Sequence, residues 1–188
     1  MSTPVRDRLT TVPNVVTIVR TVAAVTLAVA ALTRNSAILT VAAFLCYWIG
    51  DMLDGLSARL LNQETRVGAV LDIVADRACC GVCASALLVV RPEFAIPVAV
   101  FLGQFLVVDC MLSLSFIRWP ILGPNYFAAV HRGVYRWNWW PPAKVANTAG
   151  CVVLVVAAPS PWWATAFAVF VLAIKAVSLR TVARLASP

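Results

Sequence analysis

Six long apolar runs, separated by short polar breaks, restrict this chain to a helical membrane fold. The runs cover residues 14–32, 37–58, 66–90, 95–116, 142–158 and 162–179. Because about 20 apolar residues cross the hydrocarbon core of a bilayer as a helix, we expect an all-α integral membrane protein with six transmembrane helices in one domain of residues 1–188. The composition agrees, since 62% of the residues are hydrophobic and only 12% are charged. A water-soluble enzyme or a disordered chain would need far more polar residues.

The basic residues predict how these helices are oriented. If the N-terminus is cytoplasmic, 13 of the 15 Lys and Arg residues lie in or near the cytoplasmic half, and only Arg34 and Arg91 fall on outer loops. The positive-inside rule therefore predicts that both termini face the cytoplasm. The same rule accounts for the net charge of +7, so we expect membrane lipids and no nucleic acid as partners. Ahead of the first span, Val5, Leu9 and Val12 recur at helical spacing, which predicts a short amphipathic helix on the inner membrane surface.

Five aspartates lie inside the predicted spans, and four of them form two pairs. Asp51 and Asp54 are near the cytoplasmic end of the second span, and Asp72 and Asp76 are near the start of the third. Residues three or four apart share one helix face, and the short connection makes the two helices antiparallel neighbours, so the four carboxylates can meet at one depth. An ionised Asp at mid-bilayer costs about 2.5–3.5 kcal/mol, so cations must compensate them.

Hard divalent cations suit such a cluster. Two Mg²⁺ or Mn²⁺ ions would offset four carboxylates, and paired metals of this kind support phosphoryl transfer. Gly55, Ala58 and Gly68 lie on or beside the acidic faces, where small residues leave room for a ligand or a facing helix. Arg59 follows at the membrane surface, where it can meet phosphate oxygens. The alternative is a tightly packed helix pair with a structural ion cluster.

Written out, the segment is Asp51-x2-Asp54-Gly55-x2-Ala58-Arg59-x8-Gly68-x3-Asp72-x3-Asp76. It resembles the complete signature of the CDP-alcohol phosphatidyltransferase family. The upstream sequence Pro13-Asn14-x2-Thr17-x2-Arg20 also resembles the usual start of that family's first span. The resemblance implies a six-helix membrane enzyme, usually a homodimer, that transfers a phosphatidyl group from CDP-diacylglycerol to an alcohol and releases CMP.

The resemblance also implies roles for single residues. The two metal ions would be bound by Asp51, Asp54, Asp72 and Asp76. Asp76 would in addition be the general base that takes the proton from the acceptor hydroxyl. The CDP-lipid would be bound by Asn14, Thr17, Gly55, Ala58, Arg59 and Gly68, with the small residues making room for the cytidine and diphosphate. The active site would face the cytoplasm.

The acceptor alcohol is less constrained. The stretch from residue 117 to 144 contains no acid and carries the basic residues Arg118, His131, Arg132, Arg136 and Lys144. Such a cluster suits an anionic acceptor, with glycerol 3-phosphate favoured and an inositol phosphate, serine or a neutral alcohol left open. Plain positive-inside anchoring explains Arg118 and Arg136 equally well, and a lone interfacial histidine is more often structural.

Two further residues bear on the acceptor. The sequence from Ala143 to Thr148 resembles a Gly-Lys-x-x-Thr element of relatives that use phosphorylated acceptors, with Ala143 in the glycine position. This favours Lys144 as an acceptor-binding residue. Asp109, inside the fourth span, can bind an acceptor hydroxyl or pair with Arg20 or Lys144.

Two other classes of protein compete with the transferase. An ion- or proton-coupled transporter would use the intramembrane aspartates as a relay. Transporters commonly show two related halves and broken helices near the midplane, whereas this sequence has no internal repeat and its acids lie towards one surface. An inactive membrane scaffold is the other class, and the intact acids argue against it.

Overall fold

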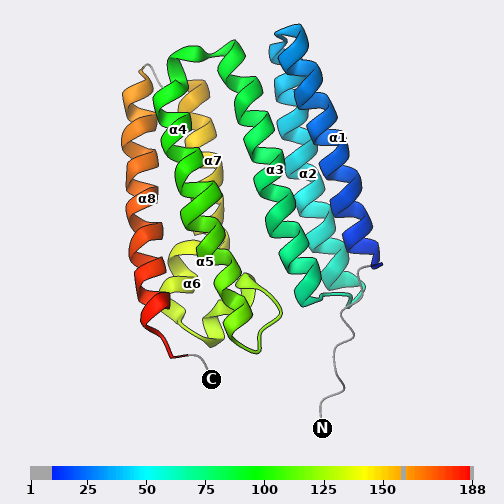
Figure 1. Cartoon of the computed structure of the whole chain (residues 1–188), viewed down its shortest axis with the longest axis vertical. Coiled ribbons are helices and arrows are strands. Elements are labelled where there is room, and N and C mark those ends of the chain that lie inside the picture. The colour runs from blue at the N-terminus through cyan, green and yellow to red at the C-terminus, as the bar shows by residue number, and fades with distance from the viewer. Residues whose placement is uncertain (1–9, 158–159, 187–188) are drawn as a thin grey trace. The chain divides into compact units, whose positions relative to one another are not determined.

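The computed structural model describes residues 10–157 and 160–186, and its regular elements in these ranges are all helical. The predicted all-α class is thus confirmed for the described part of the chain. The chain divides into two compact units, with the boundary between Val90 and Arg91. The first unit contains three long helices and the second contains the remaining elements (Figure 1).

The first unit consists of α1 (Val12–Arg34), α2 (Ala37–Leu60) and α3 (Arg66–Val90). Helix α1 packs along both α2 and α3. The turns between them are short because local residues end and restart the helices. Asn35 ends α1 in the left-handed conformation with a φ of 46°, and Ser36 caps α2. Before α3, the Thr65 hydroxyl accepts a hydrogen bond from the Gly68 amide at 2.9 Å.

Small side chains fill the contacts between these three helices. Ala24, Ala28 and Ala31 recur on one face of α1 and are at most 1% exposed. Ala28 and Ala31 pack with buried small residues of the other two helices, namely Ala43, Cys83 and Ala86. Large apolar side chains such as Val19, Val22 and Ile38 face outwards. Small residues inside and large apolar residues outside are the arrangement of helices that pack within a lipid bilayer.

The second unit begins with one continuous helical run from Pro92 to Arg118. Its parts are η1 (Pro92–Phe94), α4 (Ala95–Gly103), the π-helix η2 (Gln104–Asp109), α5 (Cys110–Leu114) and η3 (Ser115–Arg118). There follow η4 (Pro124–Ala129), α6 (Arg132–Asn138), α7 (Pro141–Ala157) and α8 (Pro161–Arg184). Helix α8 packs against α4, η2, α5 and α7. Buried Phe116, Phe127 and Leu112 belong to the core of this unit.

Five helical segments are long and apolar enough to cross a membrane, which fits a multi-pass membrane protein. They are Val12–Arg34, Ala37–Leu60, Arg66–Val90, Pro92–Arg118 and Pro161–Arg184, and they match five of the six predicted runs. The remaining run, 142–158, corresponds to α7, a helix of 17 residues that is not among the five. The count of six spans, the cytoplasmic termini and the single domain therefore stay predictions. Of the predicted surface helix, residues 1–9 lie outside the described residues, and Val12 opens α1.

Candidate active site

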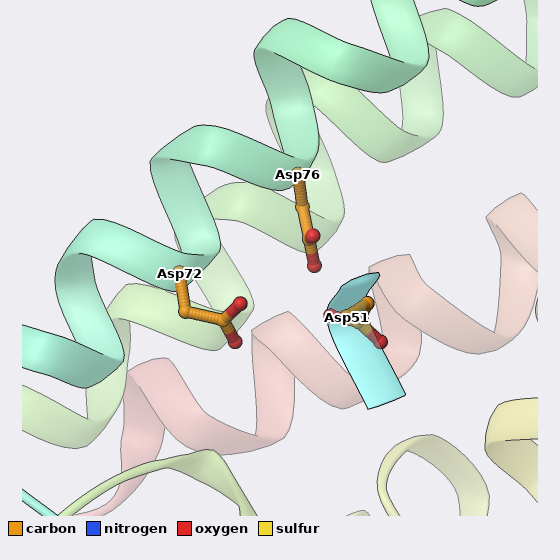
Figure 2. Close-up of side chains that lie close together, drawn as sticks. All are labelled: Asp51, Asp72 and Asp76. Carbon is orange, nitrogen blue, oxygen red and sulfur yellow. The ribbon is translucent and has the colours of Figure 1, made fainter. Parts of the chain in front are cut away.

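Two helices of the first unit carry the predicted aspartates. Asp51 and Asp54 lie on α2, and Asp72 and Asp76 lie on α3. One carboxylate oxygen from each of Asp51, Asp72 and Asp76 lies within 4.8 Å of the other two, and Figure 2 shows the three side chains pointing towards a common space. We call these three side chains the carboxylate cluster. It unites residues from both predicted pairs.

Asp54, the fourth aspartate, has different partners. Its side chain is buried, and its Oδ2 atom accepts hydrogen bonds from Thr17 Oγ1 at 2.8 Å and from Arg20 Nε at 2.6 Å. Both donors belong to α1, so Asp54 ties α2 to α1. Its contacts thus distinguish Asp54 from the carboxylate cluster, although the sequence predicts one metal-binding role for all four aspartates.

Arg20 of α1 is ion-paired with all four aspartates, a role that the sequence had not assigned to it. Its Nη2 atom lies 2.6 Å from Asp72 Oδ1, 3.0 Å from Asp76 Oδ1 and 3.6 Å from Asp51 Oδ1. The residue is only 4% exposed. A signal for it exists in the sequence, because an arginine inside an apolar run carries the same desolvation cost as an acid and must find a partner.

Close helix packing makes room for the arginine. A Cβ atom added to Gly50 of α2 would lie 2.5 Å from Arg20 Cβ and 2.7 Å from Arg20 Cδ. Only glycine permits the two helices to approach this closely, so Gly50 positions Arg20 against the acids. The guanidinium carbon also lies 5.7 Å from the centre of the Tyr47 ring, within the range of a cation–π interaction.

The residues predicted to bind the CDP-lipid make contacts of their own in the first unit. Asn14 and Thr17 are each 3% exposed on α1. A Cβ atom on Gly68 would lie 2.8 Å from Asn14 Oδ1, so Gly68 leaves room for a neighbouring side chain as well as for any ligand. On α2, a Cβ atom on Gly55 would lie 3.4 Å from Arg59 Nη1. Ala58, on the same helix, is half-buried.

The residues predicted to bind the acceptor all lie in the second unit. Arg118 donates hydrogen bonds to the carbonyl oxygens of Val182 at 3.2 Å and Leu185 at 2.9 Å, which satisfies the C-terminal end of α8. His131 caps α6, and its Nδ1 atom accepts from the Val134 amide at 3.0 Å. Arg132, which opens α6, and Lys144 on α7 are exposed. The contacts of Arg118 and His131 are those of structural residues.

Asp109, at the end of the π-helix, pairs with a residue that the sequence analysis had not considered. Its Oδ1 atom lies 2.5 Å from Nζ of Lys175 on α8, and both side chains are more than nine-tenths buried. Lys175 is the single basic residue in the predicted run 162–179. Applying to this lysine the desolvation argument used for the acids would have identified it as a residue in need of a partner.

The donor set of the carboxylate cluster fits a divalent metal ion. Mg²⁺ prefers oxygen ligands at 2.0–2.1 Å in octahedral geometry, so ligand oxygens around one ion lie at most about 4.2 Å apart. The cluster oxygens, all within 4.8 Å of one another, reach that arrangement with small side-chain movements. The two guanidinium groups near these acids, those of Arg20 and of Arg77, also cannot neutralise four carboxylates, which leaves charge for metal ions to offset.

A half-buried acidic cluster carried by apolar helices is typical of membrane enzymes that handle phosphate groups through metal ions. The comparison with known families agrees, because the model for CDP-alcohol phosphatidyltransferases matches residues 10–177. The chain belongs to this family, whose members use a CDP-alcohol substrate and an alcohol acceptor. Members of the family depend on divalent metal ions.

Curated relatives point to the same area of metabolism. Proteins of Mycobacterium bovis and Mycobacterium tuberculosis named "Putative cardiolipin synthase" are 35% identical to this chain over 72 residues. The matched segment covers 38% of this chain and 34% of each relative. Together with the family, these relatives support phospholipid biosynthesis as the process. No solved structure matches the chain at a significant level.

Proposed function

We propose that this protein transfers a phosphatidyl group from CDP-diacylglycerol to an alcohol and releases CMP. The observation that carries the proposal is the convergence of Asp51, Asp72 and Asp76 within 4.8 Å, in a chain of the CDP-alcohol phosphatidyltransferase family. Asp51, Asp54, Asp72 and Asp76 would hold two Mg²⁺ or Mn²⁺ ions. When bound, such ions stabilise the attacking and the leaving oxygen of the transferred phosphoryl group.

The reaction needs one proton acceptor among the residues of the site. The acceptor hydroxyl oxygen attacks the phosphorus that carries the diacylglycerol, and the bond from that phosphorus to the CMP oxygen breaks. The hydroxyl proton passes to a carboxylate oxygen of Asp76, which we assign as general base. Asp76 is 14% exposed in its side chain, so it is shielded from most of the solvent while it is still open to a small group.

We assign separate residues to the CDP-lipid and to the acceptor alcohol. We propose that Arg59 contacts the diphosphate beside Gly55 and Ala58, and that Asn14, Thr17 and Gly68 shape the same end of the first unit. For the acceptor, glycerol 3-phosphate is favoured by the basic stretch that contains Arg132 and Lys144. A cardiolipin-forming activity is a second candidate, because the mycobacterial relatives carry that name.

The membrane arrangement is part of the proposal. Six spans, cytoplasmic termini and a cytoplasmic active site are supported by the distribution of Lys and Arg. In this arrangement α7 crosses the membrane together with the five longer helical segments, which makes six spans. The homodimer is supported by the usual state of the family.

An assay of CMP release tests the reaction and identifies the acceptor. The purified protein is incubated with CDP-diacylglycerol, Mg²⁺ or Mn²⁺, and one alcohol at a time: glycerol 3-phosphate, an inositol phosphate, serine or phosphatidylglycerol. We expect release with one of these acceptors, loss of release with EDTA, and recovery when metal is added back. A folded protein that releases no CMP with any acceptor would refute the proposal.

The base assignment has its own test. Asp76→Asn should lower CMP release by about 10²-fold or more, since general-base catalysis contributes about 10²–10⁴-fold, while much of the CDP-lipid binding persists. Glu93→Gln is the matched control, because Glu93 is an exposed acid of the second unit that pairs with Arg91. Near-normal turnover by the Asp76 variant would show that another group takes the proton.

A further inference from the structure

The guanidinium of Arg20 lies in the space that the carboxylate cluster would offer a metal ion. Its Nη2 atom is within 3.6 Å of a carboxylate oxygen from each of the three cluster residues. One carboxylate oxygen from each of these residues also lies within 4.8 Å of the other two, so the space between the three side chains is small. A divalent ion 2.0–2.1 Å from the same oxygens would overlap the Nη2 group, and the two positive charges would repel.

We propose that Arg20 is a built-in cation of this site, and that its Nη2 group competes with a divalent metal ion for the carboxylate cluster. The inference rests on the proposed metal-dependent function and adds a residue that sets the metal affinity. Before a metal ion binds, the arginine compensates the acids. When one binds, Nη2 withdraws from the cluster.

A second contact gives the arginine an anchor that does not depend on the cluster. Nε donates to Asp54 Oδ2 at 2.6 Å, and Thr17 Oγ1 donates to the same oxygen at 2.8 Å. Rotation about the Cδ–Nε bond swings the planar guanidinium, which moves Nη2 and leaves the Nε atom in place. Arg20 therefore has one atom that stays with Asp54 and another that can leave the carboxylate cluster.

The third guanidinium nitrogen of Arg20, Nη1, indicates that the acids hold the guanidinium in its position. Nη1 of Arg20 is buried and has no hydrogen-bond acceptor among the residues that the structure describes. A buried donor without an acceptor is unfavourable. The attraction of the carboxylates thus outweighs an unmet hydrogen bond, and once metal ions offset those charges the balance favours withdrawal.

Arg20→Lys separates the contact with Asp54 from the contact with the carboxylate cluster. The lysine ammonium lies about where Cζ of arginine lies, one bond short of Nη2, so Arg20→Lys keeps a cation near Asp54 but withdraws it from the carboxylate cluster. Arg77→Gln is the matched control. It also removes a guanidinium near the site, yet Arg77 Nη1 is 3.9 Å from Asp76 Oδ2, at the limit of an ion pair. Arg20→Gln is a second variant that should also free the cluster.

The experiment measures Mn²⁺ binding by electron paramagnetic resonance of the free ion, in a non-ionic detergent and without substrate. We expect Arg20→Lys to bind Mn²⁺ at least fivefold more tightly than the natural chain, and Arg77→Gln to differ by less than threefold. If Arg20→Lys does not fold, Arg20→Gln must show the same tightening.

Two results would overturn the inference, and they are distinguishable. Equal or weaker Mn²⁺ binding by the Arg20 variants, with normal metal-dependent CMP release by the natural chain, would refute the competition and leave the proposed function intact. Failure of every protein to bind Mn²⁺, the natural chain included, would refute the metal site and the competition with it.

Discussion

Lys175→Met should destabilise the second unit more than an ordinary substitution, because it leaves a buried carboxylate without its cation. Lys175 Nζ and Asp109 Oδ1 are 2.5 Å apart, with 7% and 9% of their side chains exposed. Removing one partner of a buried ion pair costs about 3–5 kcal/mol. For a chain of 150–250 residues, each kcal/mol shifts Tm by about 2–4 °C, so we expect Tm to fall by about 6–20 °C.

A double-mutant cycle shows whether the ion pair is the cause. Asp109→Asn combined with Lys175→Met removes both charges, so the double variant should recover most of the stability that Lys175→Met loses. Thermal unfolding of the four proteins is followed in one detergent, with the fraction that remains monodisperse as the signal. A Tm of Lys175→Met within 2 °C of the natural chain, or a double variant that is no more stable than the less stable single one, would refute the reasoning.

The close approach of α1 and α2 yields another prediction. Gly50→Ala should lower the unfolding free energy by about 1–3 kcal/mol, because the new Cβ atom would overlap Arg20 and overpacking has this cost. Gly81→Ala on α3, where nothing lies within 4 Å of the added atom, should not lower it, because alanine favours the helix over glycine. Equal melting temperatures of the two alanine variants would contradict this. Thr65→Ala should lower the unfolding free energy by about 1 kcal/mol, because the Gly68 amide loses its cap. The Tm should then fall by about 2–4 °C. An unchanged Tm would mean that water replaces the cap.

Local patterns in the sequence predict the hairpin that carries the aspartates. The run 66–90 coincides with α3, and the run 37–58 ends two residues before α2 does. Hydrophobic length and short polar breaks fix these helices, and the spacing within each pair fixes which face the acids share. Antiparallel packing then brings Asp51, Asp72 and Asp76 together.

Contacts between helices distant in the sequence could not be predicted in the same way. The rotation of α1 about its axis decides whether Arg20 meets the acids, and that rotation depends on small contacts such as the one at Gly50. The pairing of Asp109 with Lys175 has the same origin. The π-helix at Gln104–Asp109 changes the helical register by one residue per turn, which hydropathy does not reveal.

The order of the charged residues along the chain has a consequence for biogenesis. Arg20 lies on α1, and its four acidic partners lie on α2 and α3, so the cation is synthesised before the anions that it compensates. Domains fold during synthesis from the N-terminus onwards. Each acidic helix that enters the bilayer therefore finds its counter-charge already there. Arg20 and its four acidic partners are all present once residue 90 has emerged from the ribosome, before the second unit exists.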